Sequence, residues 1–134
     1  MKIFDTTLTQ VERSLDVRLA RQGVLSGNVA NVDTPGYKPK DVDFMAAMSQ
    51  AMQQSAPLAH TNRLHMGESG ETGGADVDSF VRQVSGGAPS FDGNEVDLDT
   101  TMSAMAENAI QYSANTRAAS AKLALLKYVV SDGA

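Results

Sequence analysis

Cysteine and tryptophan are absent from this chain of 134 residues, and only seven residues are aromatic. Without cysteine there is no disulfide, no thiol nucleophile and no cysteine-ligated zinc site. No run approaches the ~18 consecutive apolar residues that indicate a membrane-spanning helix, so direct membrane insertion is not expected. The N-terminal residues 1–5 lack the basic and apolar run of a cleavable signal peptide, so any export is expected to use another route.

Excess positive charge is also lacking, because 11 Lys and Arg face 16 Asp and Glu, for a net charge of −5. Nucleic-acid binders usually carry a basic patch, so no nucleic-acid partner is expected. Hydrophobic residues make up 42 % of the chain, but many are Ala and Met, so large rigid core side chains are scarce. A chain of this kind is expected to bury apolar surface against other copies of itself or against partners.

Three regions differ in composition, and we take residues 1–31, 32–93 and 94–134 as the N-terminal helix, an irregular middle and a long C-terminal helix. Seven of the eleven glycines fall within 67–93. The predicted fold is mainly α. Its long N- and C-terminal helices pack as a coiled-coil-like hairpin and form one assembly domain, with a flexible Gly-rich segment between them.

The first region carries an apolar stripe at helical spacing, interrupted by Arg18 and Gln22. Its members are Phe4, Leu8, Val11, Leu15, Leu25 and Val29. Asp5, Thr6 and Thr7 can cap the helix start. The helix is predicted to end near Ala30 or Asn31.

The last region repeats apolar residues at alternating intervals of four and three for more than four heptads, which is typical of coiled-coil packing. The members are Leu98, Met102, Met105, Ala109, Tyr112, Thr116, Ala119, Leu123, Leu126 and Val130. Asp97 is the candidate N-cap. Such a helix is roughly 50 Å long, too long for the first helix to cover alone.

The middle region is predicted to contain a short helix over 44–52, with Met45, Met48 and Met52 on one face, and a short strand or turn around 77–84. His60 and His65 lie in a predicted loop without cysteines, so a structural role is favoured over a metal site. No motif brings a nucleophile, a base and an orienting group together, so no catalytic residues and no cofactor are predicted.

The most specific local sequence runs from Asn28 to Lys38. Asn28 and Asn31 are one helical turn apart, and their amides can bond backbone groups freed where the helix ends. Pro35 and Gly36 suit the two central positions of a type II turn. An ordinary helix-to-turn exit is the plain alternative.

This string resembles the N-terminal signature of bacterial flagellar rod and hook proteins, and the continuation Asp41-Val42-Asp43-Phe44 resembles the proximal-rod branch of that family. The matching positions are Asn28, Ala30, Asn31, Thr34, Pro35, Gly36, Tyr37 and Lys38. Segments 93–98 and 105–112 are similar to the family's C-terminal helix, 61–66 is a weaker match, and nothing matches over 67–90.

The resemblance implies a non-enzymatic structural subunit of the flagellar basal-body proximal rod. Such a subunit polymerises through its terminal helices into a helical tube that joins the inner-membrane ring to the distal rod. The implied partners are other copies, neighbouring rod proteins, the rod–membrane-ring junction protein and the flagellar type III export apparatus. Export without a cleaved signal peptide would place the subunit in the periplasmic rod.

We expect the apolar stripes to carry the assembly contacts. The expected interface residues are Leu8, Val11, Leu15, Leu98, Met102, Met105, Tyr112, Leu123 and Leu126. Another rod or hook subunit is the closest alternative. A helical adaptor or export chaperone that never polymerises is the second, and an unrecognised wall-degrading hydrolase is the third.

Overall fold

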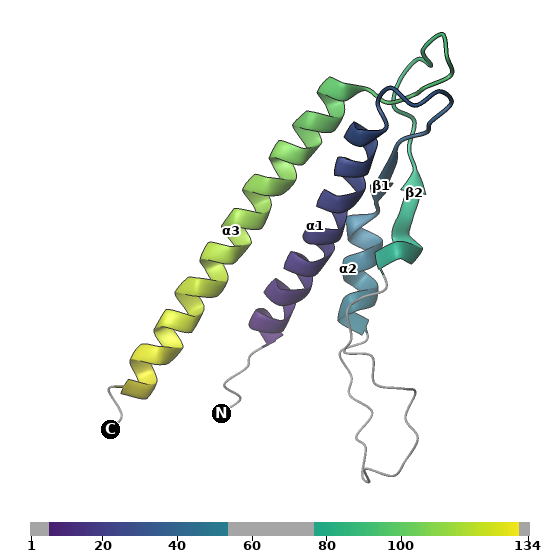
Figure 1. The fold of residues 1–134 in the computed structure, drawn as a ribbon. Coiled ribbons are helices and arrows are strands. Elements are labelled where there is room, and N and C mark those ends of the chain that lie inside the picture. Colours follow the sequence, from purple (N-terminus) through teal and green to yellow (C-terminus); the bar gives the residue numbers. More distant parts are fainter. Residues whose placement is uncertain (1–5, 54–76, 132–134) are drawn as a thin grey trace, which may run out of the picture.

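Two long helices dominate the computed structural model, which describes residues 6–53 and 77–131. Helix α1 spans Thr6–Ala30 and helix α3 spans Leu98–Ser131. They run antiparallel, side by side (Figure 1). The predicted mainly α hairpin is therefore confirmed, although Asp5 as a cap of the first helix lies outside the described residues.

The start of α3 is fixed by Asp97, as the sequence predicts. Its Oδ1 accepts the backbone N–H of Thr100 at 3.0 Å, and its carbonyl accepts the N–H of Thr101 at 3.0 Å. The first bond satisfies one of the amides that the first turn of a helix leaves without intrahelical partners, and the second is the first hydrogen bond of the helix itself.

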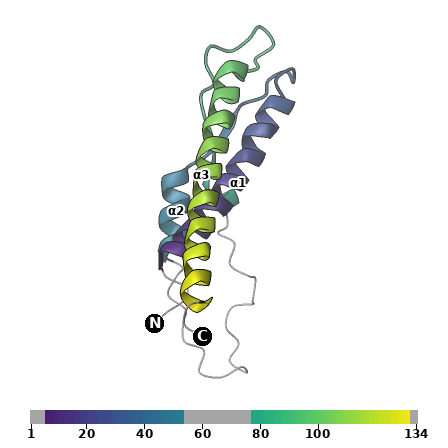
Figure 2. The same ribbon diagram turned by 90° about the vertical axis from the view of Figure 1, so that its left-hand side faces the viewer.

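Helix α1 lies between α3 on one side and a small α2–sheet layer on the other (Figures 1 and 2). That layer holds four short elements: β1 (Lys40–Val42), α2 (Phe44–Gln53), the 3-10 helix η1 (Val77–Phe80) and β2 (Val81–Gln83). The two strands pair antiparallel, with Asp41 opposite Arg82. The structure bears out the helix predicted near 44–52 and the strand or turn near 77–84. Strand β1 has no counterpart in the prediction.

The apolar core lies between α1 and this layer. Val17 and Ala47 are fully buried and Val42 is almost so, with Phe44 and Phe80 packed partly buried against them. The three methionines of α2 do not fill this core, because Met45 and Met52 are exposed and only Met48 is half-buried. Alanine on the inner face lets α2 approach α1 closely.

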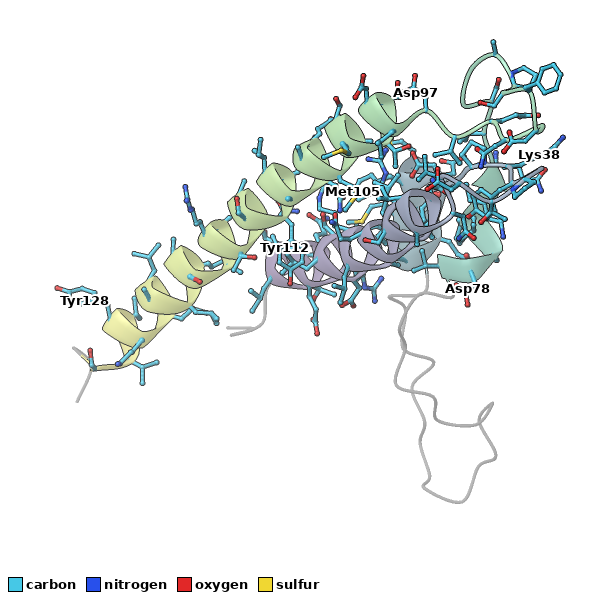
Figure 3. The ribbon with its side chains drawn as sticks, turned by 45° about the horizontal axis from the view of Figure 1, so that its top comes forward. Lys38, Asp78, Asp97, Met105, Tyr112 and Tyr128 are labelled. Atoms are coloured by element: carbon cyan, nitrogen blue, oxygen red, sulfur yellow. The ribbon has the colours of Figure 1, made fainter. Side chains whose placement is uncertain are left out.

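Helix α3 contributes little to that core. Its only buried side chains are those of Thr101 and Asn108, both polar. Figure 3 shows Tyr112 beside α1, whereas Tyr128 lies well beyond the other described elements. The C-terminal part of α3 therefore projects from the subunit.

The division into an N-terminal helix, a middle and a C-terminal helix forming one assembly domain remains a prediction. His60, His65, the weak match over 61–66 and the first part of the glycine-rich segment lie outside the described residues.

Candidate functional site

Asn28 joins the end of α1 to strand β1. Its Nδ2 donates to the carbonyl of Lys40 at 2.6 Å, and its Oδ1 accepts the N–H of Lys40 at 2.9 Å. The hydroxyl of Tyr37 donates to the same Oδ1 at 3.3 Å. One buried amide thus satisfies both backbone groups of a strand residue, as a neighbouring strand would, and fixes the direction of β1.

The turn after α1 is the type II turn that Pro35 and Gly36 predict. The N–H of Tyr37 donates to the carbonyl of Thr34 at 3.2 Å, and Gly36 has φ of 70°. The Nδ2 of Asn31 donates to the carbonyl of Gly27 at 2.8 Å, as expected of an amide at a helix end.

Asn94 holds this turn against the start of α3. Its buried Nδ2 lies 3.0, 2.8 and 2.7 Å from the carbonyl oxygens of Asn31, Val32 and Thr34, and its Oδ1 accepts the N–H of Val96 at 2.7 Å. This one side chain joins residues that lie sixty or more positions apart in the chain. We call segments 31–37 and 90–96, with the bonds between them, the clasp.

Backbone bonds and close approach complete the clasp. The N–H of Gly36 donates to the carbonyl of Asp92 at 3.1 Å, and the N–H of Glu95 donates to the carbonyl of Tyr37 at 3.0 Å. A Cβ added at Gly86 would lie 1.7 Å from the carbonyl oxygen of Glu95. The two segments on which the family resemblance rests, 28–38 and 93–98, therefore meet in space.

An ion pair ties β1 to α1. The guanidinium of Arg21 donates from Nε and one terminal nitrogen to the two carboxylate oxygens of Asp41, both at 2.7 Å. This bidentate hydrogen bonding raises the pKa of Arg21, with desolvation opposing it.

The contact between α1 and α3 is centred on polar side chains, which we call the polar seam: Ser14, Arg18 and Gln22 on α1, and Asn108, Gln111 and Asn115 on α3. The Nδ2 of Asn108 lies 2.9 Å from the carbonyl oxygen of Arg18 and 3.0 Å from the Oε1 of Gln22. Arg18 donates to Gln111, and the Nδ2 of Asn115 donates to the hydroxyl of Ser14 at 2.8 Å. The centre of this contact differs from the apolar stripe that the sequence led us to expect.

Arg18 belongs to both sides of α1, because its guanidinium also lies 4.5 Å from the centre of the Phe44 ring in α2. Burial lowers the pKa of Arg18, as does the neighbouring charge of Arg21, while Glu107 opposes the change. This side chain couples α2, α1 and α3.

The apolar stripe predicted for α3 forms two columns with a seven-residue repeat, and Ile110, Leu125, Tyr128 and Val129 are exposed outside them. The first column flanks the seam and contains Leu98, Met105, Tyr112, Ala119 and Leu126, which range from half-buried to just under two-fifths exposed. The second, the outward column, lies about 100° around α3 from the buried residues Thr101 and Asn108 and is exposed throughout; its members are Met102, Ala109, Thr116, Leu123 and Val130.

Leu8 and Leu15 of α1, both half-buried, line one surface hollow with Tyr112, Ala119 and Leu123. Val11 is half-buried on the same helix. Of the predicted interface residues, the structure thus brings Leu8 and Leu15 close to Tyr112 and Leu123. Which of the predicted residues contact another subunit stays a prediction.

At the end of α3 the apolar surface is largest. The exposed fractions are 50 % for Leu123, 66 % for Leu125, 64 % for Tyr128, 61 % for Val129 and 69 % for Val130. We call these five residues the apolar end.

Within 6–53 and 77–131, no three acidic, His or Cys side chains gather as a metal site would require. The described helices include none that is both long and apolar enough to cross a bilayer. Among the described residues, the arrangement offers packing surfaces and hydrogen bonds.

Sequence reasoning missed two functional features. Asn94 lies in segment 93–98, which resembles the family's C-terminal helix, but nothing in its local sequence indicates bonds to a turn sixty residues earlier. The seam had a visible signal, because Arg18 and Gln22 interrupt the stripe of α1 at the helical spacing of four, and Asn108 and Asn115 repeat at seven.

The sequence of this chain is similar to those of known proteins of one family. The family model described as "Flagella basal body rod protein" matches residues 15–38, which cover the second half of α1 and the turn after it. A protein of Escherichia coli (strain K12) named "Flagellar basal body rod protein FlgB" is 30 % identical over 132 residues, 96 % of each chain. The protein of the same name from Bacillus subtilis (strain 168) is 33 % identical over 135 residues, 99 % of each chain, and that of Yersinia enterocolitica is 33 % identical over 114 residues, 81 % of each.

Proposed function

The chain belongs to the family of flagellar basal body rod proteins that includes these FlgB relatives, and we propose from this membership that it is a structural subunit of the rod. More specifically, we propose that it forms part of the proximal rod. There it polymerises through its terminal helices into a helical tube that joins the inner-membrane ring to the distal rod.

The observation that carries the proposal is the exposed apolar surface of α3. Five large apolar side chains over eight residues, each at least half exposed, are unusual on a chain that acts alone. At about 25 cal/mol per Å², burying ~1,000 Å² of such surface contributes ~25 kcal/mol gross, before association and ordering costs remove most of it. Burial against neighbouring subunits therefore supports assembly as the role of this helix.

The form of the contact follows from the shape of the subunit. The apolar end lies on one projecting helix, whereas the other end of the hairpin is the hydrogen-bonded clasp, so the two ends offer unlike surfaces. A head-to-tail contact between two different surfaces gives an open helical assembly when it does not close into a ring. A tube built of such contacts fits the proposed rod.

Partners and location follow from the rod assignment. We propose that the partners are other copies, neighbouring rod proteins and the junction protein at the membrane ring, and that the flagellar type III apparatus exports the chain to the periplasmic part of the rod. The absence of cysteine suits export as an uncrosslinked chain. We propose no enzymatic activity.

A non-polymerising helical adaptor or export chaperone is the alternative from a different class, because an exposed apolar helix face also suits a single amphipathic partner. Light scattering of the purified chain at rising concentration, with and without other rod components, separates the two. Growth of large particles supports the rod subunit, whereas a complex of fixed small size supports the adaptor.

The direct test is Leu123→Asp in cells that depend on this chain for swimming. Leu123 is half exposed, so a carboxylate there is solvated in the isolated subunit but costly once a neighbour buries it. We expect loss of swimming and of basal bodies that contain the rod, with normal amounts of the protein.

The matched control is Ser120→Asp, which places the same charge on an exposed polar position of α3 less than one turn earlier. We expect this variant to swim. Normal swimming of the Leu123→Asp strain would refute the assignment of this surface to assembly. Met105→Asp is a weaker test, because Met105 is half-buried and its replacement also disturbs the subunit itself.

A further inference from the structure

A third column with a seven-residue repeat runs along α3, and it is entirely polar: Thr101, Asn108, Asn115 and Lys122. Thr101 and Asn108 are buried, and Asn115 and Lys122 are half-buried, so this column faces α1. Each residue of this column comes one position before a residue of the outward column. The two columns therefore lie about 100° apart around the helix axis.

Apolar burial alone does not explain this orientation. A rotation of α3 about its axis by one residue, about 100°, would turn the outward column from Met102 to Leu123 toward α1. There it would pack against Leu8, Val11 and Leu15, which are only half-buried. Such a rotation would remove exposed apolar surface from water, which is favourable. Specific interactions within the subunit must therefore oppose this rotation of α3.

The seam supplies that opposition through specific hydrogen bonds. Asn108 reaches two acceptors on α1, at Arg18 and Gln22. Asn115 reaches a third acceptor, the hydroxyl of Ser14, which lies about one turn before Arg18 along that helix. A rotation of one residue would replace the two asparagines by Ala109 and Thr116, and would leave polar groups of α1 facing apolar side chains.

The seam is not arranged for maximum stability. Asn108 is 1 % exposed, yet within the described ranges its Oδ1 has no hydrogen-bond partner, and the same holds for the Nε of Arg18. Buried polar groups of this kind reduce stability, and their best-attested role is to select one packing arrangement among several.

We propose that Asn108 and Asn115 are positioning residues that fix the rotation of α3 on α1. They hold the outward column of Met102, Ala109, Thr116, Leu123 and Val130 away from the subunit's own first helix. This inference rests on the proposed function, because the column is kept outward for a neighbouring rod subunit.

The test uses the lack of cysteine, which lets a single introduced thiol report exposure through its alkylation rate. Thr116→Cys places the thiol on the outward column, and Ala104→Cys places it at a half-buried position on the opposite flank of the seam. Each is made in the full chain and in the full chain with Asn108→Ala and Asn115→Ala.

We expect the double alanine change to slow alkylation of the Thr116→Cys thiol roughly tenfold, which corresponds to a thiol that is exposed a tenth of the time. We expect the same change to accelerate alkylation of the Ala104→Cys thiol. Opposite changes at the two reporters indicate rotation. Loosening of the hairpin would accelerate Ala104→Cys without slowing Thr116→Cys, and this result would overturn the proposal, as would unchanged rates.

The matched control carries Ser113→Ala and Ser120→Ala, which have the same seven-residue spacing on an exposed side of α3. We expect no change at either reporter. The alkylation rates are measured on the purified chain and do not require a rod, so a failed rotation test and a failed rod assignment give separate results. Swimming reports only the second.

Discussion

The two ends of the helical hairpin are built in opposite ways. At the clasp, glycines, a type II turn and the side chain of Asn94 bring distant segments together, and the polar groups they bury find partners within the chain. At the apolar end, the last turns of α3 project with five apolar side chains exposed. One end is therefore held by bonds within the subunit, while the other exposes apolar surface that we propose a neighbouring subunit covers.

The largest expected effect at the clasp comes from Asn94→Ala. The change removes the donor to three carbonyl groups and the acceptor for one backbone N–H, in a site only 4 % exposed. Because leaving buried polar groups unsatisfied is costly, we expect the free energy of unfolding to fall by about 3 kcal/mol. Chemical denaturation of the purified chain measures it.

Phe91→Ala is the control for Asn94→Ala, because Phe91 lies three residues away and is fully exposed. We expect its effect to stay within about 0.5 kcal/mol. Equal effects of the two substitutions would show that the clasp contributes nothing specific.

Gly86→Ala is expected to come next, at about 2 kcal/mol of destabilisation. The new methyl group would collide with the backbone of Glu95 and the ring of Pro39, so the segment must move. Gly23→Ala is the same substitution in α1 with no atom within 4 Å of the new Cβ, and we expect it to stabilise by about 0.5–1 kcal/mol. Thermal unfolding of both variants should give shifts of opposite sign, and shifts of the same sign would contradict the close approach at Gly86.

A smaller effect is expected at the start of α3, where hydrogen bonds from the backbone N–H and the side chain of Thr100 lower the pKa of Asp97 below its ordinary value. A carboxylate whose pKa is lowered by folding stabilises the native state above its unfolded pKa. This stabilisation is lost as the pH falls through the folded pKa. Asp97→Asn keeps a good capping residue that does not titrate.

We therefore expect the stability of Asp97→Asn to depend less on pH below about 4 than that of the parent chain. Denaturation curves between about pH 2 and 6 provide the measurement. Parallel pH profiles for the two proteins would argue against Asp97 as the capping carboxylate.

The smallest effect on the isolated subunit is expected from Val130→Ser, at the apolar end. Val130 is 69 % exposed, so its removal should change the free energy of unfolding by less than about 0.5 kcal/mol. The same variant should nevertheless weaken assembly, measured as reduced swimming. A large loss of stability here would remove the contrast between the two ends.

Much of the fold could be predicted because local signals determine it. Asp97 marks the start of α3, and Thr34-Pro35-Gly36 marks the turn after α1, in both cases through backbone preferences that act over a few residues. Asn28 was expected to bond backbone groups, and it does.

Other features depend on partners far away in the chain. Strand β1 has only three residues, and its partner β2 lies about forty residues later, so no local periodicity indicates it. The apolar pattern of α3 predicted a helix and its length, but not its rotation, because the pattern does not say which polar side chains meet partners on α1. Asn108 and Asn115 could be recognised as inward-facing only once Ser14, Arg18 and Gln22 were seen opposite them.

The antiparallel course of α1 and α3 places the clasp at one end of the subunit and the last turn of α3 at the other (Figure 1). A subunit with unlike ends has a head and a tail. Copies joined by contacts between unlike surfaces all point the same way, so the filament they form is polar. The two ends of such a filament expose different surfaces to an incoming subunit. This difference is sufficient for growth from one end, without an additional signal.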